Sequence, residues 1–260
     1  MAFAELRIYS ELLGMSTTVN VIIPQRSTLG EIGMSNRTAS GKYRCLYLLH
    51  GLSDDESIWM RRTSIERYAA KYGIAVVMPR GDRSFYTDIS GGEKYFSYIS
   101  VELPKIMCDL FPISPLREDN IIGGLSMGGY GAIKAALRKP ERFSRAIALS
   151  PVADICEFYD SAPSVLGRVF SDKSKIAPSD DLFKLASKLE DKDTRPSIFI
   201  AVGLSDFLYG SVTRLCRHLS DCGYDLTYTE GEGEHCWDFW DEYIKYALEW
   251  AYGTSDKQKT

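Results

Sequence analysis

The chain has 260 residues, which is long enough for one large α/β domain with a substantial core and short for two. Its apolar fraction of 45% and charged fraction of 25% are those of an ordinary globular protein. A net charge of −4 without any Lys/Arg block argues against a nucleic-acid partner, and no apolar run reaches the length of a membrane span.

The first residues carry Glu5, Arg7 and Glu11, where a secretion signal requires an uninterrupted apolar run. We therefore expect no signal peptide and a cytoplasmic protein. The six cysteines lack the spacing of a metal site, so we expect free thiols and no bound metal. They are Cys45, Cys108, Cys156, Cys216, Cys222 and Cys236.

Strand and helix patterns begin close to the first residue. Two antiparallel strands are predicted at 3–9 and 17–23, and residues 27–42 are rich in turn formers. Residues 43–49 are mostly apolar, which is typical of a strand buried on both faces. A helix is predicted over 63–72, with Thr63 and Glu66 as a capping box.

The middle of the chain continues this alternation. A strand over 74–79 and a polar loop over 80–93 precede a helix over 95–110, in which Pro104 predicts a kink or a restart. Residues 152–193 have no strong period and are interpreted as an insertion over the sheet. Further strands, and a final amphipathic helix, are predicted at 146–149, 197–202, 226–229 and about 240–251. This alternation predicts a mostly parallel sheet, in which ligands bind at the carboxyl ends of the strands.

A G-x-S-x-G motif is centred on Ser126, after a buried strand that includes Ile121 and before a helix that runs to Pro140. In this motif the serine lies on a sharp strand-to-helix turn, and a glycine two residues away on each side lets the helix pack against the strand. The hydroxyl then projects from the sheet edge beside a helix N-terminus. Ser126 is therefore predicted as a nucleophile rather than as part of a glycine-rich turn.

A serine nucleophile needs a neutral imidazole as base and a carboxylate that fixes the tautomer of that imidazole. Among the three histidines, His218 is expected on a helix surface and His50 is expected to shape a loop. His235 follows the last strand and is predicted as the base. Because the motif predicts the chain order Ser–Asp–His, Asp206 is the predicted acid. Asp154 remains as the alternative acid, and a helix N-cap is the structural interpretation of either carboxylate.

The oxyanion hole is predicted from two backbone N–H groups, those of Met127 and Leu52. Several aromatic residues fall in loops near the expected mouth of the site. Core packing is the default for each one, but as a set they suggest an apolar substrate pocket. The predicted substrate contacts are Trp59, Tyr86, Phe207 and Trp237.

With these residues assembled, the chain resembles the esterase D-like branch of the α/β-hydrolase superfamily, and most closely the tributyrin-type esterases. The resemblance implies an α/β-hydrolase fold, with a mostly parallel central sheet and helices on both faces. It also implies one domain over 1–260 with a small cap or lid at 152–193. The matching segments are 46–52 (LYLLHGL), 77–79, 102–104, 123–132 (GGLSMGGYGA), 203–209 (GLSDFLY) and 233–241 (GEHCWDFWD).

The resemblance further implies a cofactor-free carboxylesterase acting on short-chain acyl esters, with Ser126, Asp206 and His235 as its triad. Relatives in this branch remove acetyl or phenolic acyl groups from plant polysaccharides, so an acylated saccharide is one candidate substrate among small-molecule esters. The alternatives are an S-formylglutathione hydrolase-like thioesterase, an acetyl or feruloyl esterase, and, from a different class, a non-catalytic binding module with this fold. Whether the chain forms a homo-oligomer is left open.

Overall fold

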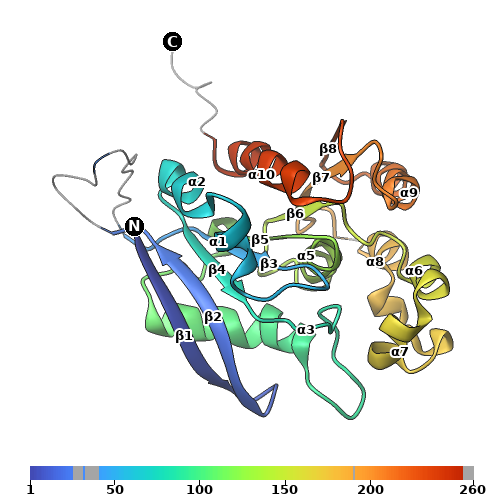
Figure 1. The fold of residues 1–260 in the computed structure, drawn as a ribbon, viewed down its shortest axis with the longest axis horizontal. Helices are drawn as coiled ribbons and strands as arrows, with labels where there is room; N and C mark the ends of the chain where they lie inside the picture. The colour runs from blue at the N-terminus through green and yellow to red at the C-terminus, as the bar shows by residue number, and fades with distance from the viewer. Residues whose placement is uncertain (26–31, 33–40, 190, 254–260) are drawn as a thin grey trace.

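Eight strands form one sheet in the computed structural model, which describes residues 1–25, 32, 41–189 and 191–253 (Figure 1). The strands lie in the order β1-β2-β4-β3-β5-β6-β7-β8. β1 and β2 are antiparallel to each other and β2 is antiparallel to β4, whereas all pairs from β4 through β8 are parallel. The predicted, mostly parallel sheet is confirmed. The strands are β1 (Ala2–Ser10), β2 (Met15–Ile23), β3 (Cys45–Leu49), β4 (Ala75–Pro79), β5 (Asn120–Leu125), β6 (Arg145–Leu149), β7 (Ser197–Gly203) and β8 (Leu226–Gly231).

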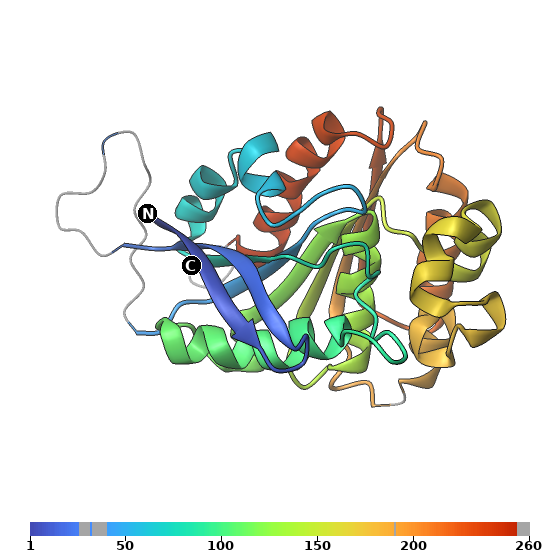
Figure 2. The same ribbon diagram turned by 60° about the horizontal axis from the view of Figure 1, so that its bottom comes forward.

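Helices cover both faces of the sheet, as expected (Figure 2). One face packs against α1 (Ile58–Arg62), α2 (Ile65–Tyr72) and α10 (Trp237–Tyr252). The opposite face packs against the remaining helices. These are α3 (Tyr95–Ser97), α4 (Leu103–Leu110), α5 (Met127–Arg138), α8 (Leu182–Lys188) and α9 (Tyr209–Asp221), with α6 (Ile155–Ser161) and α7 (Pro163–Phe170) beside them.

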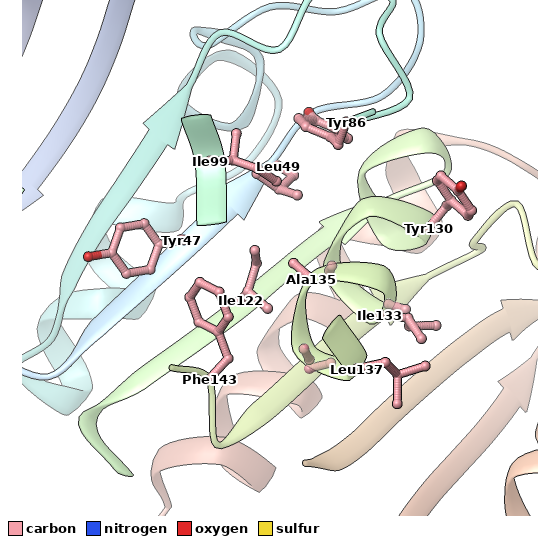
Figure 3. Packing of buried hydrophobic residues seen from close by; sticks show 14 of the residues in the cluster. Tyr47, Leu49, Tyr86, Ile99, Ile122, Tyr130, Ile133, Ala135, Leu137 and Phe143 are labelled. Carbon is pink, nitrogen blue, oxygen red and sulfur yellow. The ribbon is translucent and has the colours of Figure 1, made fainter. Parts of the chain in front are cut away.

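The helix after Ser126, α5, lies at the centre of the larger hydrophobic cluster (Figure 3). Its residues are buried almost throughout, because it packs on β5 and β6 while α8 covers its other side. Tyr130 and Ile133 belong to this cluster, together with Ile122 of β5 and Phe143 just before β6. The turn that carries the nucleophile therefore lies between two fully buried elements, which fixes its geometry.

One local prediction is confirmed by the structure and another is corrected. The helix over 95–110 does restart at Pro104, because a π-helical turn at Tyr98–Glu102 ends there and α4 begins at Leu103 with Pro104 in its first turn. Such a turn shifts the hydrogen-bond ladder next to the residue that lacks an N–H. The reciprocal capping box does not form, because the backbone N–H of Thr63 that Glu66 would bind donates to the carbonyl of Trp59 at the end of α1. The hydroxyl of Thr63 still accepts a hydrogen bond from the N–H of Ile65 at the start of α2.

The segment 152–193 folds into α6, α7 and α8 with two 3₁₀ turns, Lys173–Lys175 and Pro178–Asp180. It lies beside α5 and α9, at the side of the molecule away from β1 (Figure 2). The predicted turn-rich segment 27–42 falls almost entirely outside the described residues. In the described chain, no helix is long and apolar enough to cross a membrane. All six cysteines are free.

Candidate active site

Ser126 lies at the junction of β5 and α5 with a φ of 52°, a left-handed conformation that is strained for a residue with a side chain. The positions two residues before and after Ser126 must be glycine, because a Cβ atom at either one would clash with neighbouring backbone. A Cβ on Gly124 would lie 2.5 Å from the carbonyl carbon of Gly128, and a Cβ on Gly128 would lie 2.5 Å from the carbonyl oxygen of Leu49. The G-x-S-x-G spacing thus allows the helix to return against the sheet directly after the serine.

Side chains from three loops meet at this turn. The Nε2 atom of His235 lies 3.0 Å from the Oγ atom of Ser126, and its Nδ1 atom lies 2.9 Å from the Oδ2 atom of Asp206. Asp206 follows β7 and His235 follows β8, so both reach the serine from the carboxyl ends of neighbouring parallel strands. The arrangement can pass a proton from the hydroxyl to the imidazole while the carboxylate holds the imidazole tautomer.

The carboxylate of Asp206 is fully shielded from solvent and remains ionised. Burial alone raises the pKa of this carboxyl, but hydrogen bonds from His235, from the N–H of Leu208 and from Ser150 outweigh burial and leave the pKa below its ordinary value. The Leu208 N–H contact measures 2.8 Å. Asp206 therefore provides a negative charge beside the imidazole at neutral pH.

Two aromatic rings pack against the imidazole of His235. The ring of Phe207 lies 4.7 Å from it, centroid to centroid, and the ring of Trp240 lies 4.8 Å away in an edge-on arrangement. Trp240 also donates its indole N–H to the hydroxyl of Ser150, which in turn contacts Asp206. One tryptophan thus positions both the imidazole and the carboxylate, a role that the sequence patterns did not indicate.

The other candidates for acid and base lie elsewhere. Asp154 caps the N-terminus of α6 by accepting hydrogen bonds from the backbone N–H groups of Cys156 and Glu157. His218 lies on α9, where its Nε2 atom is 2.9 Å from the carbonyl of Phe183. Among the described residues, neither side chain has a hydrogen bond to Ser126 or His235, so the structure brings together the first-choice set and leaves the alternatives apart.

His50 is buried and holds the loop after β3. Its Nδ1 atom lies 2.7 Å from the Gly51 carbonyl, and its Nε2 atom accepts a hydrogen bond from the N–H of Gly81 at 2.9 Å. Because Gly51 offers only an acceptor, Nδ1 carries the hydrogen and the ring is neutral. Burial accordingly lowers the pKa of His50, against weaker raising effects from the Gly51 carbonyl and nearby carboxylates.

The Gly51–Leu52 peptide is oriented by this contact. In a trans peptide the C=O and N–H point in opposite directions, so a carbonyl held by His50 directs the Leu52 N–H away from the histidine. Leu52 and Met127 both line the cavity in front of Ser126. Within the described chain, neither backbone N–H has a protein acceptor. Both are therefore available to an oxygen bound in the cavity.

A cavity of about 530 Å³ opens in front of Ser126 and His235. Its walls are mainly apolar, and Phe207, 70% exposed, stands at its mouth. Two of the aromatic contacts expected from the sequence, Phe207 and Trp237, line it. The lining residues that sequence reasoning missed include Asp54, Phe85, Leu125, Val152, Phe158, Cys236 and Trp240.

Trp59 and Tyr86, also expected to touch substrate, lie behind the cavity wall, which corrects that expectation. Trp59 is 1% exposed and donates its indole N–H to the Leu49 carbonyl. Tyr86 is fully buried and donates its hydroxyl to the His50 carbonyl. Their polar atoms are satisfied by backbone carbonyls, so both residues support the loop around the oxyanion donors. Across the described residues, no group of three His, Cys, Asp or Glu side chains could hold a metal ion.

Known esterases match nearly the whole chain. The family model described as "Putative esterase" matches residues 10–249. The chain is 35% identical to an acetyl esterase from Caldicellulosiruptor saccharolyticus, an alignment that covers 98% of this chain and all of that protein.

Two solved structures from Staphylococcus aureus are similar over nearly the whole chain. The fluorophosphonate-binding serine hydrolase FphF is 34% identical, with a TM-score of 0.82, and the match covers 97% of this chain and 99% of that one. The S-formylglutathione hydrolase FrmB is also 34% identical, with a TM-score of 0.83 and coverage of 96% and 98%.

Proposed function

Because the chain belongs to the esterase family of α/β-hydrolases and is a serine carboxylic ester hydrolase, we propose that Ser126, His235 and Asp206 are its catalytic triad. One observation carries the proposal. Hydrogen bonds of 3.0 Å and 2.9 Å connect hydroxyl, imidazole and carboxylate in series at the edge of one sheet. This is the geometry that nucleophilic acyl transfer by a serine requires.

Acylation begins when His235 Nε2 removes the hydroxyl proton of Ser126 and Oγ attacks the ester carbonyl carbon. The carbonyl oxygen takes up negative charge, which the backbone N–H groups of Leu52 and Met127 stabilise. The C–O bond to the alcohol then breaks, and the imidazolium gives its proton to the departing oxygen. Asp206 stabilises the imidazolium while it exists, which its lowered pKa supports.

Deacylation repeats the same steps with water as the nucleophile. His235 takes a proton from the water, the hydroxide attacks the acyl carbon on Ser126 Oγ, and the acid product leaves as Oγ recovers its proton. The same two N–H donors act on the second oxyanion. Each donor of this kind is typically worth ~10²–10³ in rate.

We propose short-chain acyl esters, acetyl esters of saccharides among them, as the substrates. The apolar walls and modest volume of the cavity support a small acyl group, and the exposed ring of Phe207 offers a flat surface for the alcohol portion. The segment 152–193 would act as a cap over this end of the sheet, since Phe158 of α6 and Val152 just before it form part of the cavity wall.

A second candidate is hydrolysis of an S-formylglutathione-type thioester. It is favoured by the 34% identity to the S. aureus S-formylglutathione hydrolase over almost the full length of both chains. A thioester uses the same nucleophile, base and oxyanion donors, and differs only in the leaving atom.

Steady-state kinetics on a panel of esters tests these proposals. The panel contains p-nitrophenyl acetate, butyrate and octanoate, a feruloyl ester, an acetylated xylo-oligosaccharide and S-formylglutathione, each measured with wild type and with Ser126→Ala. We expect acetate and butyrate to exceed octanoate in kcat/KM, and Ser126→Ala to lower kcat by about 10⁶. A loss below tenfold would remove Ser126 from the chemistry, and a dominant thioester activity would favour the second candidate.

A further inference from the structure

The strand β1 forms the end of the sheet, and its outer edge faces away from the other elements of the described chain (Figure 1). Within the described residues, its only strand partner is β2. β1 and β2 pair one-to-one over nine positions, so the edge contains no bulge, and it contains no proline or glycine. A long and regular strand edge of this kind is a template for pairing with another strand.

The hairpin is held in place at its tip. The hydroxyl of Ser10 and the backbone N–H of Glu11 both donate to the carboxylate of Glu102, which lies at the start of α4. The half-buried side chains of Leu6 and Ile8 pack on the large hydrophobic cluster. The strand is therefore already ordered, and pairing along its outer edge would require little further loss of conformational entropy.

The exposed face of β1 carries two aromatic residues and two opposite charges. Phe3 is 43% exposed, Tyr9 is 64% exposed, and Glu5 and Arg7 lie between them. Across the hairpin, Glu5 faces Asn20 and Arg7 faces Thr18. In the described part of the chain, neither charge has an ion-pair partner.

We infer that β1 is a self-complementary edge through which two copies of this chain pair in antiparallel orientation, joining their sheets into one. A two-fold axis at Leu6 places Leu6 opposite the partner's Leu6. It places Glu5 opposite the partner's Arg7, and Phe3 opposite the partner's Tyr9. The Glu5–Arg7 and Phe3–Tyr9 pairs thus each occur twice in the dimer and the Leu6 pair occurs once on the axis, as an isologous interface requires.

Neighbouring registers do not share this property. Side chains keep to one face only if the register shifts by whole pairs, so the two-fold axis moves to Glu5 or to Arg7. An axis at Glu5 places it against the partner's Glu5, and an axis at Arg7 places two arginines in contact. Like charges directly opposite each other are destabilising. The charge pattern therefore disfavours both adjacent registers, and the axis at Leu6 is the one that pairs all nine residues of the strand.

Pairing at β1 leaves both active sites open. Ser126, Asp206 and His235 follow β5, β7 and β8, which lie in the half of the sheet far from β1. Assembly and catalysis are therefore separable, and variants on β1 can be checked for correct folding by their esterase activity.

Sedimentation equilibrium tests the interface through charge reversal. Wild type is expected to sediment at twice the chain mass of 29.2 kDa. Glu5→Arg and Arg7→Glu each turn both charge pairs repulsive and are expected to raise the dimer Kd by about tenfold or more. The double variant Glu5→Arg/Arg7→Glu restores opposite charges and is expected to restore the dimer. A monomeric wild type, or a dimer indifferent to the single reversals, would overturn the inference.

Cysteine cross-linking tests the register independently. Opposite residues of an antiparallel pair have Cα atoms about 4.5–5.5 Å apart, within disulfide range, so oxidised Leu6→Cys is expected to form a covalent dimer. The matched control is Ala4→Cys on the same face of the strand. Its Cα atom would be offset from that of its copy by about 13 Å along the strand, at about 3.3 Å per residue, and the two sulfurs are expected to remain unlinked. Equal cross-linking of both variants, or of neither, would refute this register.

Discussion

Lys134 provides the sharpest test of how the nucleophile helix is held. This lysine of α5 is fully buried, and its ammonium group lies 2.7 Å from the Thr87 hydroxyl, 3.1 Å from the Phe85 carbonyl and 3.1 Å from Asp180 Oδ1. It thereby joins α5 to the loop behind the oxyanion donors and to the segment that we propose as a cap. Lys134→Met keeps most of the side-chain volume and removes all of these contacts.

The expected loss of stability in Lys134→Met follows from the burial of Asp180. The side chain of Asp180 is 10% exposed, and without Lys134 its nearest cation is Arg138, at 3.9 Å. Removing one member of a buried ion pair typically costs about 3–5 kcal/mol, because the other charge stays buried. At about 2–4 °C per kcal/mol for a chain of this size, the melting temperature should fall by about 6–20 °C.

A matched control separates burial from ion pairing. Lys184 also lies 3.1 Å from an aspartate, Asp181, but its side chain is 59% exposed. Lys184→Met should therefore melt within error of wild type, because an exposed pair is screened by solvent. Urea unfolding of both variants, with p-nitrophenyl acetate turnover as a check on the site, makes the comparison. Equal losses for the two variants would refute the argument from burial.

The difference in unfolding free energy between wild type and Lys134→Met should change with pH in a defined direction. Burial lowers the pKa of Lys134 from 10.5 to about 8, against the opposing attraction of Asp180. Between these values the unfolded chain holds a proton that the folded chain has released, so wild type gains stability as the pH rises, by at most about 1.4 kcal/mol per unit. The deficit of the variant should therefore grow from pH 8 to pH 10. A deficit that shrinks over this range would contradict the assigned environment.

Three further substitutions probe the site itself. Asp206→Asn should lower kcat by ~10⁴ with little change in melting temperature, because the imidazole loses its fixed tautomer, whereas Asp154→Asn should leave kcat nearly unchanged; the reverse result would move the acid. His50→Ala should lower kcat by up to about 10² at similar KM by releasing the peptide that presents the Leu52 N–H, and a change confined to KM would argue against this. Phe207→Ala should raise KM for aromatic esters more than for methyl esters, with equal shifts counting against contact with the alcohol portion.

The sequence predicted the central strands well because they are buried on both faces. The runs in β3, β5 and β7 are almost entirely apolar, and no helix period competes with such short segments. The helix α1 escaped notice because five residues are too few to show a period. The capping box at Thr63 was wrong for a related reason, since the backbone N–H of Thr63 that Glu66 would bind is already used at the end of the unpredicted α1.

Some residues of the site could likewise be predicted from sequence patterns, whereas others depend on how the helices pack. The sequence allowed the selection of Ser126, Asp206 and His235. Parallel strands bring their carboxyl ends to one edge of the sheet, so residues directly after these strands lie close together. Their roles remain a prediction that the substitutions test. Trp240 and Phe158 could not be selected. Their places in the site depend on how α10 packs on the sheet and how α6 leans over it, and neither orientation is visible in a local pattern.

Ser150 connects the nucleophile Ser126 to the acid Asp206 and fixes their relative positions. The strand before it accepts the N–H of Ser126 at the Leu149 carbonyl, at 2.9 Å, while the N–H of Ser150 itself donates to Ala201 of β7, at 2.7 Å. Its hydroxyl accepts from Trp240 and contacts Asp206. The nucleophile and the acid are therefore tied to the same turn at the end of β6, although they lie 80 positions apart in the chain. A hydrogen-bond network of this kind sets the distance between imidazole and hydroxyl through rigid backbone, so the site is organised before any substrate enters.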